Sequence, residues 1–417
     1  MNLTIQTCTP IWTGAVKTGR MDRIHETNII GSLRWWYEAI VRGLGGEVCN
    51  PTSDNPAERC PRENGDYCKV CRIFGATGRR RTFRLRMGTG TYLFNDSIRS
   101  IPLPSGRIHQ THRGPRSGGW YLMGESMLGH AVPLEIIPIS SDYKELHLRL
   151  VLTLLDRHAA IGAKVSNGYG VVSIWENKQH IRVTSEDLDS LTQVQSQPSR
   201  YHTLPDIRDF FFAKVRFEEP ADNQNWWQQI RGIDEALAGQ VTNTYGQQVN
   251  VYHTKDGTNE DRRVQASEHL HIIFRNGLLP MAPAVRNYLR FHWLPTLFSS
   301  GRTPGRLEEY LFGRTGAQNN IASKINVSHA YRLENGQWEL RVWGYIPCRS
   351  LEGISLNRDV FLGELRSALE DVGTWNWIFN ADHPTPQVTE WHALPCDQTD
   401  GMDYLKELLG LGEGGAQ

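Results

Sequence analysis

Apolar positions recur with helical spacing near the start of the chain. Positions 29, 33, 36, 37, 40, 41 and 44 are apolar or aromatic, which is the spacing of one helix face. This segment holds the sequence L-R-W-W at 33–36, and glycines at 43, 45 and 46 mark its expected end. The sequence F-G-A-T-G follows at 74–78, and the alternation at 82–87 predicts a strand.

The second half of the chain repeats this order. L-R-F at 289–291 lies on another aromatic-rich helical segment, F-G-R-T-G follows at 312–316, and 321–327 reads as a strand. Because two short matches occur in the same order, we interpret the halves as two copies of one fold. The first copy has the longer spacing between its two motifs, and the extra length coincides with a cysteine-rich segment.

Polar residues separate the two copies. The segment 187–205 is rich in Gln, Ser, Asp and Pro and reads as a linker, and the apolar run at 210–217 then predicts a first strand. Further strands are expected at 148–154 and 338–345, and a helix at 361–372. The pattern predicts an α+β protein of two tandem ferredoxin-like (RRM-like) domains, at 1–190 and 206–417, with an insert at 47–72 in the first.

Composition restricts the function classes. The chain has 417 residues, 39% hydrophobic, and its 45 Lys plus Arg balance 45 Asp plus Glu. A zero net charge argues against a uniformly basic nucleic-acid binder, so any RNA-binding surface must be local. No segment has the ~20 apolar residues of a membrane span, and the N-terminus lacks signal-peptide features. We therefore expect a cytoplasmic protein without a membrane partner, in which clustered cysteines favour metal over disulfides.

Four of the seven cysteines lie close together in the sequence, at Cys49, Cys60, Cys68 and Cys71. The C-x-x-C pair at the end lets two thiolates reach one tetrahedral Zn²⁺, and the polar residues between the cysteines cannot build a core. We predict a structural zinc site without an open position for water, the alternative being a loop with incidental thiols. The other three cysteines, Cys8, Cys348 and Cys396, are isolated and expected to be ordinary small residues.

A glycine-rich segment at 161–171 contains candidate phosphate ligands. Gly162 and Gly168 permit a close backbone approach, Lys164 adds positive charge, and Ser166 and Asn167 add hydrogen-bond donors. A plain glycine-rich turn is the alternative. The segment matches neither the P-loop nor the dinucleotide fingerprint, so we expect no nucleotide cofactor.

Two basic stretches are candidate RNA contacts, with solvated basic loops as the alternative. The second stretch also contains glycines and aromatic residues, which suits a loop that contacts phosphates and stacks on bases. Two further arginines lie among aromatic residues and either pair internally or face an RNA backbone. The candidates are Arg79, Arg80, Arg81 and Arg84 in the first stretch, Arg107, His109, His112, Arg113 and Arg116 in the second, and the isolated Arg34 and Arg290.

Together these segments resemble the RAMP superfamily of CRISPR proteins. The sequence I-G-A-K-V-S-N-G-Y-G at 161–170 is similar to its glycine-rich loop, with Lys164 in place of the more usual arginine. T-P-I-W-T-G-A at 9–15, I-G-S-L-R-W-W-Y at 30–37 and C-R-I-F-G at 71–75 resemble the Cmr-one subunits of type III-B effector complexes. The resemblance is better in the first half, because the second lacks a comparable glycine-rich loop.

This resemblance implies a non-catalytic subunit of an antiviral ribonucleoprotein. It implies binding of CRISPR guide RNA, target RNA or both, near the guide 3′ end, beside other RAMP subunits that include the one cutting the target. One alternative is a metal-independent endoribonuclease, with His25, His109 or His112 as base and Lys164 as a cation. The mid-chain glycine-rich loop disfavours it, since processing enzymes carry theirs near the C-terminus. The other alternative is a zinc-stabilised interaction subunit without direct RNA contact.

Overall fold

The computed structural model describes residues 1–14, 21–94, 100–111, 114–118, 120–189, 191, 204–242, 246–252, 259–314, 320–348, 357–382 and 384–411. Several sequence predictions lie outside these ranges. They concern His112 and Arg113, most of the linker at 187–205, and the T-G of the second F-G-R-T-G.

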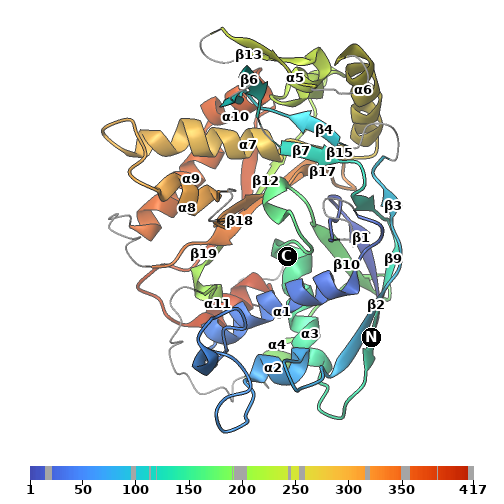
Figure 1. The fold of residues 1–417 in the computed structure, drawn as a ribbon, viewed down its shortest axis with the longest axis vertical. Helices are drawn as coiled ribbons and strands as arrows, with labels where there is room; N and C mark the ends of the chain where they lie inside the picture. The colour runs from blue at the N-terminus through green and yellow to red at the C-terminus, as the bar shows by residue number, and fades with distance from the viewer. Residues whose placement is uncertain are drawn as a thin grey trace.

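The first half forms a five-stranded antiparallel sheet in the order β11-β10-β1-β9-β2. Helices α1 and α3 pack beside it (Figure 1). The strands are β1 (Asn2–Thr7), β2 (Phe83–Met87), β9 (Val132–Pro138), β10 (Val172–Glu176) and β11 (Gln179–His180), and the helices of this half are α1 (Glu26–Gly43), α2 (Lys69–Phe74), α3 (Glu145–His158) and α4 (Ser185–Asp189). The predicted helix around L-R-W-W and the predicted strand at 82–87 are confirmed as α1 and β2.

The predicted strand at 148–154 is wrong, because these residues lie inside α3. The side chains of Leu148, Leu150, Val151 and Leu152 are all buried. A helix enclosed on all sides has a continuous apolar run, which periodicity cannot distinguish from a buried strand. Helix α1 and strand β10 of the first half and helix α11 (Gly401–Leu408) of the second half pack against α3, and Arg341 of the second half donates hydrogen bonds to carbonyl oxygens at the end of α3.

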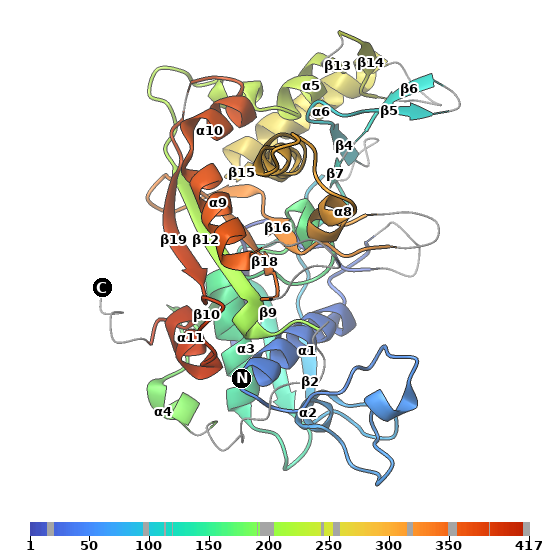
Figure 2. The same ribbon diagram turned by 90° about the vertical axis from the view of Figure 1, so that its left-hand side faces the viewer.

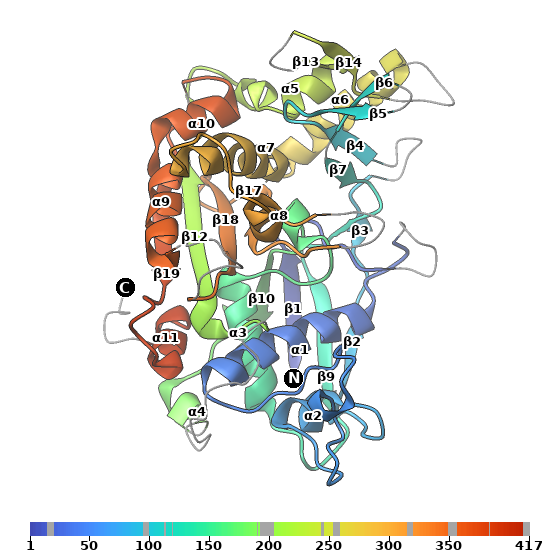
Figure 3. The same cartoon turned by 60° about the vertical axis from the view of Figure 1, so that its left-hand side comes forward.

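The second half forms another antiparallel sheet, in the order β15-β17-β18-β12-β19, with β16 paired to β18. Helix α9 lies beside β12 and β19 (Figure 2 and Figure 3). The strands are β12 (Phe210–Phe217), β15 (Leu278–Leu279), β16 (Ile325–Val327), β17 (Ala330–Arg332), β18 (Trp338–Tyr345) and β19 (Gln387–Ala393), and the helices are α5 (Ile233–Ala238), α6 (Asn259–Arg275), α7 (Ala282–Tyr288), α8 (Leu307–Phe312), α9 (Arg358–Glu370), α10 (Val372–Phe379) and α11 (Gly401–Leu408).

The two sheets share one connection order. The strands β10-β1-β9-β2 of the first half correspond to β19-β12-β18-β16 of the second. In each half a six-residue helix, α2 or α8, ends at the F-G motif before the second strand of this set. Gly75 and Gly313 follow these helices with positive φ of 84° and 75°, where a Cβ would approach backbone atoms within 3.0 Å. The internal repeat inferred from sequence is therefore present in three dimensions.

A segment of the first half packs against the second half. Strands β4 (Ser100–Leu103), β5 (Ile108–Thr111), β6 (Gly114–Ser117) and β7 (Trp120–Met123) project toward α5 and β14 (Gln248–Asn250) (Figure 2). The amide of Gly106 donates to Glu235 Oε1 at 2.7 Å, and the Ser117 hydroxyl donates to the Val251 carbonyl at 3.2 Å. The remaining short strands are β3 (Thr91–Tyr92), β8 (Met127–Leu128) and β13 (Gln240–Thr242).

The prediction that Cys348 and Cys396 are ordinary small residues is wrong, because they form a disulfide. The sheet explains the pairing. Strand β12 lies between β18 and β19, which places Tyr345 and Ala393 opposite adjacent residues of β12. Each cysteine follows its strand end by three positions, so the two thiols meet at one sheet edge.

No helix within the described ranges has the length and apolar character required to cross a membrane.

Candidate functional site

The four clustered cysteines converge in space. Cys49 follows α1, Cys60 lies in the insert, Cys68 is the N-cap residue of α2, and Cys71 lies in its first turn. Their sulfur atoms all lie within 4.8 Å of one another, and Cys49 Sγ is 3.4 Å from Cys71 Sγ. Thiolates around one tetrahedral Zn²⁺ lie about 3.8 Å apart for bonds of about 2.3 Å. The four sulfur atoms are therefore close enough together to bind one metal ion, as we predicted from the C-x-x-C spacing.

The surroundings of the cluster favour a thiolate at Cys68. Hydrogen bonds from Cys49 and Cys71 lower the pKa of Cys68, whereas the pKa values of Cys49 and Cys71 are raised. The Arg34 guanidinium donates from Nη2 to Cys71 Sγ at 3.2 Å. A nearby cation offsets part of the negative charge that four thiolates bring to a metal. Cys49, Cys68 and Cys71 are buried, which also limits access of water to the site.

Arg34 and Arg290 both pair internally, which is one of the two roles considered for them. Arg34 bonds to Glu38 at 2.8 Å and to the Gly75 carbonyl at 2.7 Å, in addition to Cys71. Arg290 bonds to Glu308 at 2.7 Å and to the Gly313 carbonyl at 3.2 Å. Contact of Arg34 or Arg290 with RNA remains a prediction, and the internal partners of both arginines argue against it.

The glycine-rich loop is where the RAMP-like segments meet. The Gly162 amide donates to the Ser32 hydroxyl at 3.0 Å, which belongs to the G-S-L-R-W-W segment. The Ala163 and Gly170 amides donate to the carbonyl oxygens of Trp12 and Pro10, in the T-P-I-W-T-G segment. Three motifs that are far apart in the sequence thus form one local structure.

Lys164 and its neighbours form the accessible part of this loop. Lys164 has a left-handed backbone with φ of 58°, and its Nζ lies 4.1 Å from the centre of the Trp12 ring. Partial burial lowers the pKa of Lys164. Ser166 and Asn167 lie on the 3-10 turn η2 (Val165–Asn167) and are partly exposed. A cation and two polar side chains are therefore presented together.

The two predicted glycine contacts have another structural role. Gly168 is buried against the second half, where a Cβ would lie 2.7 Å from His329 Nδ1, and its carbonyl accepts from the His329 amide. A Cβ on Gly162 would lie 2.6 Å from the Trp12 carbonyl oxygen. Both amides already donate to protein oxygens. These glycines permit close packing, and His329 is a partner that the sequence did not indicate.

The first basic stretch surrounds α2 and β2. Arg79 pairs with Asp142 at 3.3 Å and lies over the Tyr67 ring, and Arg81 donates to the Phe83 carbonyl. Arg80 and Arg84 are exposed, the latter on the outer face of β2.

The second basic stretch forms the hairpin of β5 and β6. His109 and Arg116 are directly opposite each other in its register, and both are exposed. Although His109 is exposed, partial desolvation of its ring lowers its pKa below the ordinary value, and nearby Arg107 contributes. Arg107 itself lies 4.9 Å over the Phe291 ring, which Arg290 also approaches at 5.0 Å. The hairpin and α2 lie toward opposite ends of the molecule (Figure 2), so the structure does not gather the predicted basic residues into one patch.

Comparisons with known proteins agree with the motifs. The model of the RAMP superfamily matches residues 4–173, the part that contains all three motif segments and the glycine-rich loop. A solved structure described as Cmr1 from Pyrococcus furiosus in its apo form has a TM-score of 0.32 and 10% identity, over 85% of this chain and 91% of that chain. A search of curated proteins found no match. The match to the RAMP superfamily model thus covers residues 4–173, which is less than half of the chain.

Proposed function

We propose that this chain is a non-catalytic RNA-binding subunit of a type III-B CRISPR effector ribonucleoprotein, placed at the guide 3′ end, where it helps capture target RNA in antiviral defence. The observation that carries the proposal is the convergence of the RAMP motif segments on the loop that presents Lys164. Its partners are guide RNA, target RNA or both, together with other RAMP subunits.

The finer description of the fold is part of this proposal. Two tandem ferredoxin-like domains, at 1–190 and 206–417, would account for the strand order that the two sheets share. The hydrogen bonds of Gly106 and Ser117 to the second half mean that the first domain would extend a hairpin across the boundary.

RNA binding would be mainly electrostatic and independent of base sequence. A guided effector reads sequence by base pairing, while the protein contacts backbone and shape. Lys164 on the loop, the exposed Arg80 and Arg84 near α2, and Arg116 on the hairpin are the accessible cations among the described candidates. Because they are distributed along the molecule, the proposal implies an extended RNA path over a neutral protein.

A structural Zn²⁺ in the four-cysteine cluster is also proposed. It would be held by Cys49, Cys60, Cys68 and Cys71, and it would close the insert, which has few apolar residues of its own. A site with four thiolates leaves no coordination position for a reacting water.

A binding role agrees better with the histidine contacts than a nuclease role. His25 precedes α1 and pairs with Asp22 at 2.7 Å, whereas His109 lies on the β5–β6 hairpin. Lys164 contacts the Trp12 ring. The base and the cation of a nuclease have to flank one phosphate, and these residues belong to separate elements with other partners.

The test is the affinity of the purified chain for single-stranded RNA at several salt concentrations. Replacing Arg80, Arg84 and Arg116 by alanine should lower the affinity and reduce its salt dependence, by about 0.7 in the log–log slope for each phosphate that is no longer neutralised. Arg366→Ala is the control, because Arg366 is exposed on α9 and pairs with Glu370. Equal affinities and slopes for the triple variant and the wild type would refute binding through these residues.

A further inference from the structure

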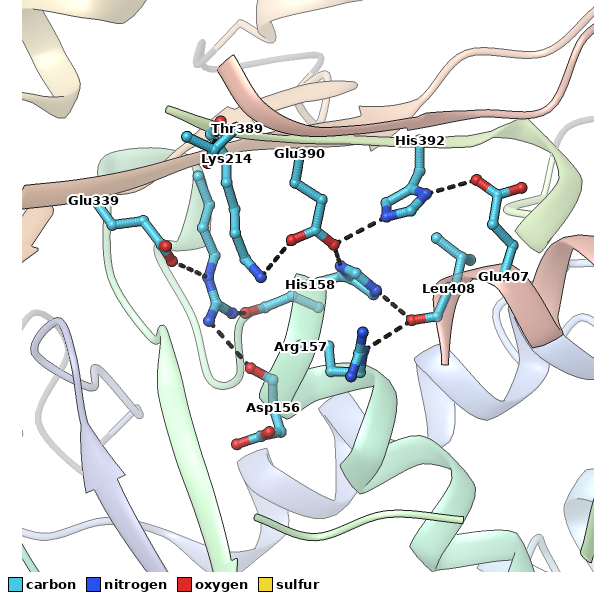
Figure 4. A network of polar contacts seen from close by, with 12 residues as sticks. Asp156, Arg157, His158, Lys214, Glu339, Thr389, Glu390, His392, Glu407 and Leu408 are labelled. Carbon is cyan, nitrogen blue, oxygen red and sulfur yellow. Dashed lines mark hydrogen bonds and ion pairs between the residues drawn. The ribbon is translucent and has the colours of Figure 1, made fainter. Parts of the chain in front are cut away.

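A second group of potential metal ligands lies where the two halves meet. His158 is the last residue of α3 in the first half, whereas Glu390 and His392 lie two positions apart on β19 in the second. One ligand atom from each of the three residues lies within 4.8 Å of the others. Figure 4 shows the three side chains directed toward one another between these elements.

Each histidine is held through the ring nitrogen that faces away from the group. The Nε2 atom of His158 hydrogen bonds to the Leu408 carbonyl, and Nδ1 of His392 is 2.6 Å from Glu407 Oε1 (Figure 4). Both partners are acceptors, so these nitrogens carry the hydrogens and the inner nitrogens are left as potential ligands. Metal-binding histidines are oriented in this way, by a carbonyl or a carboxylate on the outer nitrogen.

The inner nitrogen of His158 faces another acceptor. His158 is fully buried, and its Nδ1 lies 3.5 Å from Glu390 Oε1 without a hydrogen-bond partner among the described residues. A lone pair and a carboxylate oxygen directed at each other repel unless a cation lies between them. A second proton would place a charge on a fully buried ring near Lys214, which is an expensive location for it.

The distances suit a small divalent ion. His392 Nε2 and Glu390 Oε1 form a hydrogen bond of 2.9 Å, which a metal ion would replace. Ligands around a tetrahedral Zn²⁺ lie about 3.3 Å apart for bonds of about 2.0 Å, so a small shift of these side chains would admit the ion. Lys214 Nζ is 2.6 Å from the other oxygen of Glu390, so Glu390 would bind through Oε1 alone. Imidazole nitrogens with one carboxylate are a ligand set that Zn²⁺ accepts, with solvent as the fourth ligand on the exposed side of Glu390.

We infer that His158, Glu390 and His392 form a zinc site that is separate from the cysteine cluster and joins the two halves of the chain. The ion would link the end of α3 to β19, and through Glu407 and the Leu408 carbonyl it would fix α11 against both. Its role would be to hold the halves in one arrangement, independently of any RNA contact.

The test is the zinc content of the full-length chain after saturation with Zn²⁺ and removal of free metal. The wild type should hold two ions per chain, and Glu390→Gln or His392→Gln should each lower this to one. The double variant Cys68→Ser, Cys71→Ser should also hold one zinc ion. A variant that combines these two changes with Glu390→Gln should hold no zinc. The control is His130→Gln, because His130 is an exposed histidine away from the group, and it should retain two.

Titration of the wild type with Co²⁺ tests the same inference without depending on the folding of any variant. One equivalent should produce the intense thiolate-to-metal charge-transfer absorption of the cysteine site. The second equivalent of Co²⁺ should add only weak visible bands, which are typical of Co²⁺ bound by nitrogen and oxygen ligands. Saturation at a single thiolate-bound equivalent, or zinc contents unchanged by Glu390→Gln and His392→Gln, would overturn the inference.

Discussion

Arg34 donates a hydrogen bond from Nη1 to the carbonyl oxygen of Gly75, at a distance of 2.7 Å. The second half contains the same relationship, from Arg290 Nη1 to Gly313 at 3.2 Å. In each half an arginine on the aromatic-rich helix thus secures the turn after F-G, where only glycine fits without strain. The recurrence of this contact explains why the two short motifs are repeated together in the sequence.

Removing either arginine should destabilise the protein rather than affect RNA binding alone. Arg34→Ala leaves the Gly75 carbonyl without its donor and the buried Glu38 with only Arg42, so we expect a loss of about 2 kcal/mol. Arg34→Lys should restore little, because an ammonium cannot reproduce the forked contacts. Urea unfolding measures the change.

The matched variants are Arg290→Ala, expected to lose a similar amount, and Arg84→Ala, an exposed arginine expected to change stability by less than about 0.5 kcal/mol. Unfolding curves of Arg34→Ala and Arg84→Ala that coincide would contradict a structural role for the Arg34 contact.

Loss of the thiolate pair should release metal from the insert. Cys68→Ser with Cys71→Ser removes both ligands supplied by α2, and the insert has few apolar contacts to compensate. We expect the loss of one zinc ion per chain and faster proteolysis between residues 47 and 72. Cys8→Ser is the control, since Cys8 lies outside the cluster. If the wild type held no metal and the double variant were as stable as the wild type, the proposed structural metal site would be contradicted.

The docking of the β5–β6 hairpin should depend on pH. Burial, and secondarily the charge of Asp234, raise the pKa of Glu235 to about 8, while its Oε1 accepts the Gly106 amide. The folded state therefore binds more protons than the unfolded state between the ordinary glutamate pKa and about 8. Stability should fall as the pH rises through this window, by up to about 1.4 kcal/mol per pH unit.

Glu235→Gln should remove this part of the pH dependence and be the more stable form at alkaline pH, because it keeps an acceptor for Gly106 without a buried charge. Free energies of unfolding measured from pH 5 to pH 9 test the prediction. Parallel curves for the variant and the wild type would count against it.

The sequence predicted features that depend on local spacing. The helix with L-R-W-W, the strand at 210–217, the internal repeat and the convergence of four cysteines are all present. The errors concern residues whose environment is set by distant segments. Helix α3 was taken as a strand because elements of both halves bury it, and the Cys348–Cys396 pair depends on the strand order around β12.

The His158 group was missed for the same reason. Nothing near His158 in the sequence marks it as a ligand, and Glu390 and His392 show only the two-residue spacing that many exposed strands have. Their meeting requires the first half to pack on β19, which no local pattern reveals. The arginines were placed among the RNA candidates because sequence shows charge but not the internal partners of Arg34 and Arg290.

Replacement of the lysine in the glycine-rich loop should weaken RNA association without changing base preference. Lys164→Ala removes one cation beside Trp12 and leaves the loop amides of Gly162 and Ala163 in their protein hydrogen bonds. We expect a several-fold loss of affinity, with the same ratio among RNAs of different sequence. Lys164→Arg, the residue more usual in the resembled loop, should retain binding. Altered base preference in Lys164→Ala would show that the loop reads bases.

The central claim, a place in a guide-RNA effector complex, is tested most directly by isolating the tagged chain from its native cells. The bound RNA would be sequenced and the accompanying proteins identified by mass spectrometry. The account predicts guide RNAs that carry CRISPR repeat sequence, together with other RAMP subunits. Recovery of the chain alone and free of RNA, while it remains folded, would contradict it.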